Sequence, residues 1–407
     1  MNVLRSLSVL LALAMVVASP RSVAAQQVGT AAVSRCGALT RTQLAAVDRA
    51  VQGAIDAGRV PGVSLGIAWR GTTCLRAYGR ADLENAVPVT GESVFWVMSV
   101  NKEFTAASVM LLAERGLLGL DDPLSRYLPS YPWAQRVTIR QLLSHTSGIR
   151  EFLAQPPERR AAIEARMRAD PSRGVPELVD FIAAMSPDVF EFTPGTSWKY
   201  SNTNYVLLGA VIERVSGMSW PEFMRRNLFE PLGLRDTAVD NLLEVVPHRV
   251  RGYLRGPDGF LNAGEFPRNL AGPAGSLHST ARDLLTWQLA LMGGRVVTQE
   301  HVRMMMSPAR LGNGRPVGQE HIPNALDNGI AAYGLGFMLN DDAGRRTVGH
   351  IGNFPGFETT LQTYPDHGLT LAILTNRSGA ATELAPQVAR AILGPGPSSD
   401  ASAIAGH

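Results

Sequence analysis

Segments with a strand pattern occupy both ends of this chain, and segments with a helix pattern fill its middle. Near the N-terminus, residues 63–69 and 73–80 are apolar runs separated by Arg70-Gly71-Thr72, which is typical of a β-hairpin. Four further runs predict strands near the C-terminus: 333–339, 345–350, 357–364 and 369–375. The pattern therefore predicts an antiparallel sheet built from both ends of the chain, with a helical insertion between them.

We therefore expect a mixed α/β (α+β) fold in which the first and last helices flank the sheet. The first helix should follow Thr40, which forms a capping-box pattern with Gln43. A chain of 407 residues, 45% of them hydrophobic, can bury a large core. We expect one main domain at 26–395 and a flexible tail at 396–407. The domain should consist of a sheet lobe, at about 37–98 and 275–395, and a mainly helical lobe, at about 99–274.

Residues 1–25 have the pattern of a secretory signal peptide. Arg5 precedes a short apolar run, 6–18, and Val23-Ala24-Ala25 supplies small residues before a cut ahead of Gln26. We expect the mature protein to be periplasmic or secreted, without stable membrane insertion. The two cysteines, Cys36 and Cys74, both lie in the exported part, so a disulfide and two free thiols are both open readings.

Ser99 and Lys102 are candidates for an activated nucleophile and its base. Helical spacing begins near Ser99, and residues three apart share one face of a helix. A lysine becomes a base when burial lowers its pKa, whereas arginine cannot lose its proton in proteins. Lysine occurs only at 102 and 199, against 36 arginines, so a lysine stands where a base would be needed.

Charge and composition exclude several other functions. The formal net charge is +3 and the basic residues are scattered, which argues against nucleic acid as a partner. The eight histidines form no metal-ligating pattern, so we expect neither a metal nor a cofactor. Gly62-Val63-Ser64-Leu65-Gly66 matches the nucleophile elbow of α/β-hydrolases, but Pro61 and an extended run surround it, so we interpret Ser64 as a strand residue.

Two further motifs complete a recognisable set. Tyr200-Ser201-Asn202 lies 101 residues beyond Ser99, and His350-Ile351-Gly352, followed by Asn353, ends a strand. With Ser99 and Lys102, these motifs resemble the serine β-lactamase and penicillin-binding-protein superfamily, in its class C β-lactamase-like branch. The resemblance covers about 44–393, and further matching segments are 120–123, 142–148, 194–196, 231–234 and 279–283.

The resemblance implies a role for each matched residue. Ser99 would attack a carbonyl to form an acyl-enzyme, and Lys102 and Tyr200 would share the general-base and general-acid work. Asn202 would bind the substrate amide or the lysine. The backbone N–H groups of Ser99 and Asn353 would form the oxyanion hole. His350 and Gly352 would lie on the strand that binds substrate.

His350 departs from the lactamase pattern, which has Lys-Thr-Gly at this point. A histidine is largely neutral at pH 7.5 and offers no fixed charge to the carboxylate of a β-lactam. We therefore expect an exported serine hydrolase of small esters, amides or peptides, with an esterase ahead of a D-alanyl-D-alanine carboxypeptidase or D-aminopeptidase, and a lactamase third. The alternative of another class is a penicillin-recognising or partner-binding protein with little turnover. The sequence does not specify the natural substrate or the oligomeric state.

Overall fold

The structure is a computed structural model that describes most of the chain after the predicted signal peptide. It covers residues 36–396 except 155, 171–173, 185–188, 241 and 319–330. The predicted signal peptide, 1–25, and all of the predicted tail after residue 396 lie outside the described residues. Among the described helices, none combines the length and apolar character needed to cross a bilayer.

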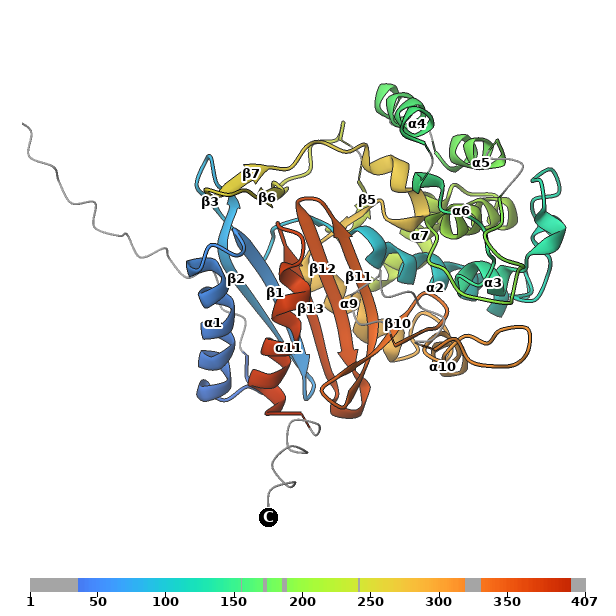
Figure 1. The fold of residues 1–407 in the computed structure, drawn as a ribbon. Helices are drawn as coiled ribbons and strands as arrows, with labels where there is room; N and C mark the ends of the chain where they lie inside the picture. Colours follow the sequence, from blue (N-terminus) through green and yellow to red (C-terminus); the bar gives the residue numbers. More distant parts are fainter. Residues whose placement is uncertain are drawn as a thin grey trace, which may run out of the picture. The chain divides into compact units, whose positions relative to one another are not determined.

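A single eight-stranded antiparallel sheet is assembled from both ends of the chain, as predicted (Figure 1). Its strand order is β3-β2-β1-β13-β12-β11-β10-β9. The strands are β1 (Gly62–Trp69), β2 (Thr72–Asp82), β3 (Val87–Pro88), β9 (Ala332–Tyr333), β10 (Met338–Asp342), β11 (Arg345–Phe354), β12 (Phe357–Tyr364) and β13 (Leu369–Thr375). The two ends of the chain meet where β1 pairs with β13, with Val63 opposite Thr375.

Helices cover both faces of the sheet. On one face, α1 (Arg41–Asp56) and α11 (Ala380–Leu393) pack on each other and on the strands (Figure 1). Odd-numbered residues of β1, such as Val63 and Leu65, point into this layer because successive side chains of a strand alternate between faces. The opposite face meets α9 (Ala281–Met292). Gly66 allows that contact, since a Cβ there would lie 2.8 Å from the Leu285 side chain.

The middle of the chain forms the predicted helical part. Its core is α2, the Asn101–Glu114 helix, which is buried on nearly all sides and packs against α6 (Asn202–Ser216). The other helices are α3 (Ile139–Leu143), α4 (Pro157–Ala169), α5 (Val175–Ala183), α7 (Trp220–Met224), α8 (Glu230–Leu232) and α10 (Gln299–Met305). Small sheets join this part to the rest: β4 (Phe95–Trp96) with β8 (Leu277–Ser279) and β5 (Ala238–Val239), and the hairpin of β6 (Tyr253–Arg255) and β7 (Phe260–Asn262).

Two local predictions differ from the structure. The run at 333–339 is not one strand, because Gly334 to Phe337 form a turn between β9 and β10. Gly336 has φ +84°, and a Cβ there would lie 2.5 Å from the Ala106 side chain, so the chain bends where α2 approaches it. The helix predicted from Ser99 begins as a 3₁₀ turn, η1 (Met98–Val100), and continues as α2.

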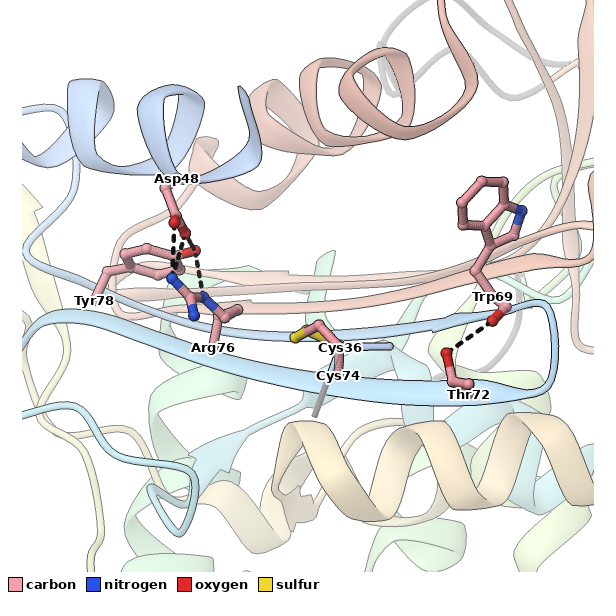
Figure 2. The surroundings of a disulfide bond; sticks show 7 residues. All are labelled: Cys36, Asp48, Trp69, Thr72, Cys74, Arg76 and Tyr78. Atoms are coloured by element: carbon pink, nitrogen blue, oxygen red, sulfur yellow. Dashed lines mark hydrogen bonds and ion pairs between the residues drawn. A yellow bond between two sulfur atoms is a disulfide. The ribbon is translucent and has the colours of Figure 1, made fainter. Parts of the chain in front are cut away.

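The N-terminal segment is attached to the sheet at two points (Figure 2). Cys36 and Cys74 form a disulfide, which resolves the alternative left open by the sequence and ties the start of the described chain to β2. Asp48 of α1 accepts hydrogen bonds from Arg76 Nη2 at 2.7 and 2.8 Å and from the Tyr78 hydroxyl at 2.6 Å. Arg76 and Tyr78 are two apart on β2, so both face α1.

We expect the disulfide to contribute substantially to stability. It closes a loop with a sequence separation of 38 residues, and for loops of this size the loss of unfolded-state entropy predicts about 2–4 kcal/mol. The Cys36→Ser/Cys74→Ser variant should therefore unfold at lower urea concentration than the wild-type protein. Wild-type protein treated with reductant should approach the double variant, and the double variant should not respond to reductant. Equal urea midpoints for the oxidised wild type and the double variant would contradict this expectation.

Candidate active site

Ser99 lies on a strained turn at the entrance to α2. The preceding residue, Met98, has φ +47°, a backbone conformation that side-chain-bearing residues rarely adopt. The turn is held by Val97, whose N–H donates to the Leu277 carbonyl of β8 at 2.9 Å. Ser99 is partly exposed, whereas Met98 and Val100 on either side are buried. The turn therefore presents one hydroxyl from an otherwise buried segment.

Lys102 is fully buried, and its ammonium makes three hydrogen bonds. Nζ donates to Ser99 Oγ at 3.0 Å, to Asn202 Oδ1 at 2.7 Å and to the Ala274 carbonyl at 2.8 Å. An ammonium has three N–H donors, so each one has an acceptor. The acceptors come from η1, α6 and η6 (Arg268–Ala274), three segments far apart in the sequence.

Burial lowers the pKa of Lys102 to about 7, because a low-polarity environment disfavours the charged form. The negative charge of Glu151 opposes this shift. A lysine with a pKa near 7 is neutral in a large fraction of molecules at physiological pH. Its lone pair can then accept the Ser99 proton across the same 3.0 Å contact.

Tyr200 and Asn202 reach the lysine from the start of α6. The Lys102 ammonium lies 4.8 Å from the centre of the Tyr200 ring, and Asn202 binds the ammonium directly. Burial raises the pKa of Tyr200 well above its ordinary value, and hydrogen bonding with the Ser99 hydroxyl opposes that rise. Tyr200 therefore holds its proton at neutral pH.

Glu151 belongs to the same cluster and was not predicted from the sequence. Its carboxylate accepts the backbone N–H of Asn202 at 2.5 Å, and this bond caps a free N–H at the start of α6. The carboxylate also accepts the backbone N–H of Leu153 at 3.0 Å. Burial raises the pKa of Glu151, and the Lys102 charge opposes that rise. In the sequence, Glu151 lies three residues after the matching segment 142–148, and that position specifies no contact.

Strand β11 passes directly beside the nucleophile at Gly352. A Cβ on Gly352 would lie 2.1 Å from the Val97 carbonyl and 3.0 Å from the Ser99 nitrogen, so only glycine permits this approach. The next residue, Asn353, has an exposed side chain. The oxyanion hole formed by the Ser99 and Asn353 amides stays a prediction.

His350 lies on β11 behind this point, with its side chain buried. Its Nδ1 faces the Ile351 carbonyl at 2.8 Å and therefore carries the proton, so Nε2 accepts from the Tyr333 hydroxyl at 3.0 Å. Burial, and secondarily the Lys102 charge, lower the pKa of His350 to about 3. The imidazole is neutral at physiological pH, and both of its nitrogens already have partners.

His145, interpreted from the sequence as a turn residue, supports the tyrosines of the site. It has φ +59°, and its ring lies 4.4 Å from that of Tyr200 and 4.8 Å from that of Tyr333. Nδ1 accepts the Ser201 N–H at 3.2 Å, and burial lowers the pKa of His145 well below its ordinary value. This neutral ring packs behind Tyr200 and fixes the segment that enters α6.

The structure thus brings Ser99, Lys102, Tyr200 and Asn202 together, with Gly352 of β11 in contact with the nucleophile's amide. A hydroxyl beside a lysine of lowered pKa and a protonated phenol form a nucleophile with a base and an acid. This set of groups can transfer an acyl group.

Comparisons with known proteins identify relatives of this chain. The chain is 31% identical over 320 residues to a penicillin-binding protein of Bacillus subtilis (strain 168), covering 74% of this chain and 64% of the relative. It is 30% identical over 348 residues to Penicillin-binding protein 4 of Amycolatopsis lactamdurans, covering 82% of this chain and 85% of the relative. The chain therefore spans less than two thirds of the length of the first of these relatives.

A solved structure has the same fold. The D-amino acid amidase from Ochrobactrum anthropi SV3, complexed with D-phenylalanine, superposes with a TM-score of 0.73 at 28% identity, over 86% of this chain and 99% of the amidase. Residues 47–393 match the family described as Beta-lactamase. With the serine, lysine and tyrosine assembled as described, the chain belongs to the Beta-lactamase family, whose relatives include penicillin-binding proteins and D-amino acid amidases.

Proposed function

We propose that this chain is an exported serine hydrolase that cleaves an ester or amide through an acyl-enzyme on Ser99. The observation that carries the proposal is the 3.0 Å contact between Ser99 Oγ and a fully buried Lys102 whose pKa is lowered to about 7. A solvated lysine would keep its proton at neutral pH and could not activate the serine.

The reaction follows from the positions of these groups. Ser99 Oγ attacks the carbonyl carbon while its proton passes to Lys102, and the resulting oxyanion is stabilised by the amides of Ser99 and Asn353. The bond to the leaving group then breaks, and the leaving group takes a proton from Tyr200, which regains one from Lys102. A water molecule, deprotonated by the same pair, attacks the acyl carbon. Ser99 leaves as its hydroxyl, and the acid product is released.

The neutral side chain at position 350 favours an ester or a neutral amide as substrate over a β-lactam with its carboxylate. His350 stands where the lactamase pattern has a lysine, and it is buried, neutral and bonded to Tyr333. It therefore supplies no fixed cation for a substrate carboxylate. The likeness to a D-amino acid amidase supports a D-aminoacyl amide or peptide as the second candidate, ahead of a β-lactam.

Export is supported by the disulfide. Disulfides persist in oxidising compartments and are rare in the cytosol, and Cys36–Cys74 pairs the two cysteines of the chain. We propose a periplasmic or secreted location for the mature protein. Fractionation of expressing cells, with the cleavage site read by N-terminal sequencing, tests this; an uncleaved protein in the cytosol would contradict it.

Side-by-side turnover of short-chain p-nitrophenyl esters, a D-Ala-D-Ala peptide, a D-amino acid amide and nitrocefin tests the proposed activity. Steady release of p-nitrophenol indicates a hydrolase. A single burst equal to the enzyme concentration, followed by no release, indicates a trapped acyl-enzyme and a binding function instead.

Ser99→Ala should abolish turnover, with a loss of at least about 10⁴-fold, because it removes the hydroxyl that Lys102 contacts at 3.0 Å. Ser64→Ala is the matched control: Ser64 is buried inside β1, between Leu374 and Ala77, and should be dispensable for chemistry. Thermal melts should show both variants folded. An active Ser99→Ala enzyme alongside an inactive Ser64→Ala enzyme would overturn the assignment of the nucleophile.

The acylation rate should rise with pH through about 7. Lys102 must be neutral to accept a proton, and its lowered pKa of about 7 means that the neutral fraction grows from pH 6 to 8 and then levels off. Single-turnover acylation by a chromogenic ester across pH 6 to 10 measures this. A rate that rises only near pH 10 would indicate a lysine with an ordinary pKa.

Lys102→Arg should be nearly as inactive as Lys102→Ala, losing roughly 10²–10⁴ in acylation rate. A guanidinium keeps the charge but cannot release its proton, so the comparison separates proton transfer from charge stabilisation. Binding of a substrate analogue and a thermal melt control for the added bulk. Acylation by Lys102→Arg within a few-fold of wild type would rule out the base role and leave Tyr200 as the candidate.

A further inference from the structure

A hollow of about 490 Å³ lies beyond the end of β11, outside the groups used by the proposed chemistry. Five of the side chains that line it share a planar or aromatic surface: Trp96, Phe266, Phe354, Phe357 and Arg268. They come from β4, from the segment between β7 and η6, from the first residue of η6, and from both sides of the turn between β11 and β12.

One lining residue of this hollow, Phe354, lies two residues along β11 from the point where that strand meets the turn of the nucleophile. Phe354 is two residues past Gly352, so its side chain projects from the same face of β11 that meets Val97 and Ser99. Two strand residues span about 7 Å, a distance that a short acyl chain attached to Ser99 can cross. Trp96 begins the turn that carries Ser99, and its indole N–H donates to the Gly275 carbonyl at 2.6 Å.

The direction of the hollow matches the acyl side of the substrate. Tyr200 would protonate the leaving group, so the leaving group must face Tyr200 and the His350 end of β11, whose rings lie 6.2 Å apart. Phe354 lies four residues further along the strand, about 13 Å from His350. The part of the substrate that stays bound to Ser99 therefore extends toward Phe354 and the hollow.

The aromatic rings form a preorganised apolar wall. The centre of the Phe354 ring lies 5.1 Å from that of Trp96 and 4.5 Å from that of Phe266, and Phe266 stacks on Trp96 at 6.0 Å. Rings that already contact one another keep their geometry when a ligand binds. Such a wall suits a flat aromatic group, which stacks on it with little loss of freedom.

Arg268 supplies a polar end to this wall. Its side chain is 11% exposed and stacks over Trp96 and Phe357, with centroid distances of 5.3 and 5.5 Å. Nη1 is bound to the buried carboxylate of Asp240, which also accepts from Arg249 at 2.5 Å. Among the described residues, no acceptor contacts Arg268 Nε or Nη2. A fixed guanidinium with unused donors is suited to a carboxylate or another planar acceptor.

Other charges also border the hollow. Arg251 lies at its edge but is bound to Glu84 at 2.7 Å and lies 3.5 Å from Asp82, and Glu265 contributes one carboxylate to the lining. Among the described residues that line the hollow, Arg268 is therefore the guanidinium that combines low exposure, stacking on the aromatic wall and N–H donors without an acceptor.

Resting on the proposed function, we propose that this hollow is the acyl-group subsite, and that it selects an aromatic acyl group bearing a carboxylate or similar acceptor, which Arg268 binds. The aromatic wall would hold the ring, and the guanidinium would recognise its far end. The proposal specifies the class of acyl group that the hydrolase accepts. It places no restriction on the leaving group.

Three p-nitrophenyl esters with one common leaving group test the proposal: acetate, 3-phenylpropanoate and 3-(4-carboxyphenyl)propanoate. For wild-type protein, kcat/KM should increase about tenfold or more from the acetate to the phenylpropanoate, and further for the carboxylated ester. Failure of the wild type to turn over any of the three esters would count against the proposed hydrolase itself, whereas turnover without this order would overturn only the subsite.

Two variants separate the aromatic wall from the guanidinium. Relative to the acetate measured in the same variant, Phe266→Ala should lose about tenfold on both aryl esters, mainly through KM. Arg268→Met should lose about tenfold on the carboxylated ester and little on the phenylpropanoate. Leu261→Ala, a substitution of an exposed β7 residue that does not line the hollow, is the control and should leave the ratios unchanged.

The substrate ratios correct for any general loss of activity, because each variant is compared with its own acetate rate. Unchanged ratios in Phe266→Ala would overturn the proposal, as would an equal loss on both aryl esters in Arg268→Met. Should Arg268→Met fail to fold, inhibition of wild-type turnover by free 3-(4-carboxyphenyl)propanoate decides the role of the guanidinium. It should be at least tenfold stronger than inhibition by 3-(4-carbamoylphenyl)propanoate, and equal inhibition would overturn that role.

Discussion

The burial of one ammonium group sets the requirements for the whole site. Lys102 has no exposed surface, and a buried charge is costly unless its hydrogen bonds are satisfied. Its three acceptors, Ser99, Asn202 and the Ala274 carbonyl, come from segments up to 175 residues apart. The fold must therefore bring η1, α6 and η6 together around α2, and these contacts create the reactive centre at the same time.

The segments that carry two of these acceptors, Ala274 and Asn202, are themselves held by buried polar groups. Next to Ala274, the Pro273 carbonyl accepts from Thr105 at 2.6 Å, and Asn101 Oδ1 accepts the Ser276 N–H at 3.0 Å. On the other side, Glu151 fixes the start of α6 and thus the Asn202 amide. Polar networks of this kind stabilise a structure only when every member is satisfied, so the position of the lysine is specified by the surrounding core.

Sequence patterns predicted the structural features that depend on residues close together in the chain. The capping box at Thr40, the hairpin of β1 and β2, and the proximity of Ser99 and Lys102 all follow from spacing within one segment. Glu151, Tyr333 and the Ala274 carbonyl were not predicted, because each acts through contacts between segments, and a backbone carbonyl has no residue type to recognise. The Cys36–Cys74 pairing was open for the same reason, since spacing alone gives no distance between two thiols.

The electrostatics of the buried cluster determine which group titrates near neutral pH. In an active site, a histidine with an ordinary pKa would be expected to titrate at about 6.5. Here burial, reinforced by the Lys102 charge, lowers the pKa of both His145 and His350, the latter to about 3, and both rings stay neutral. Lys102, shifted down to about 7 by the same burial, occupies the range normally assigned to histidine. In this low-polarity core, the amine of Lys102 therefore titrates near neutral pH, while the two imidazoles stay neutral.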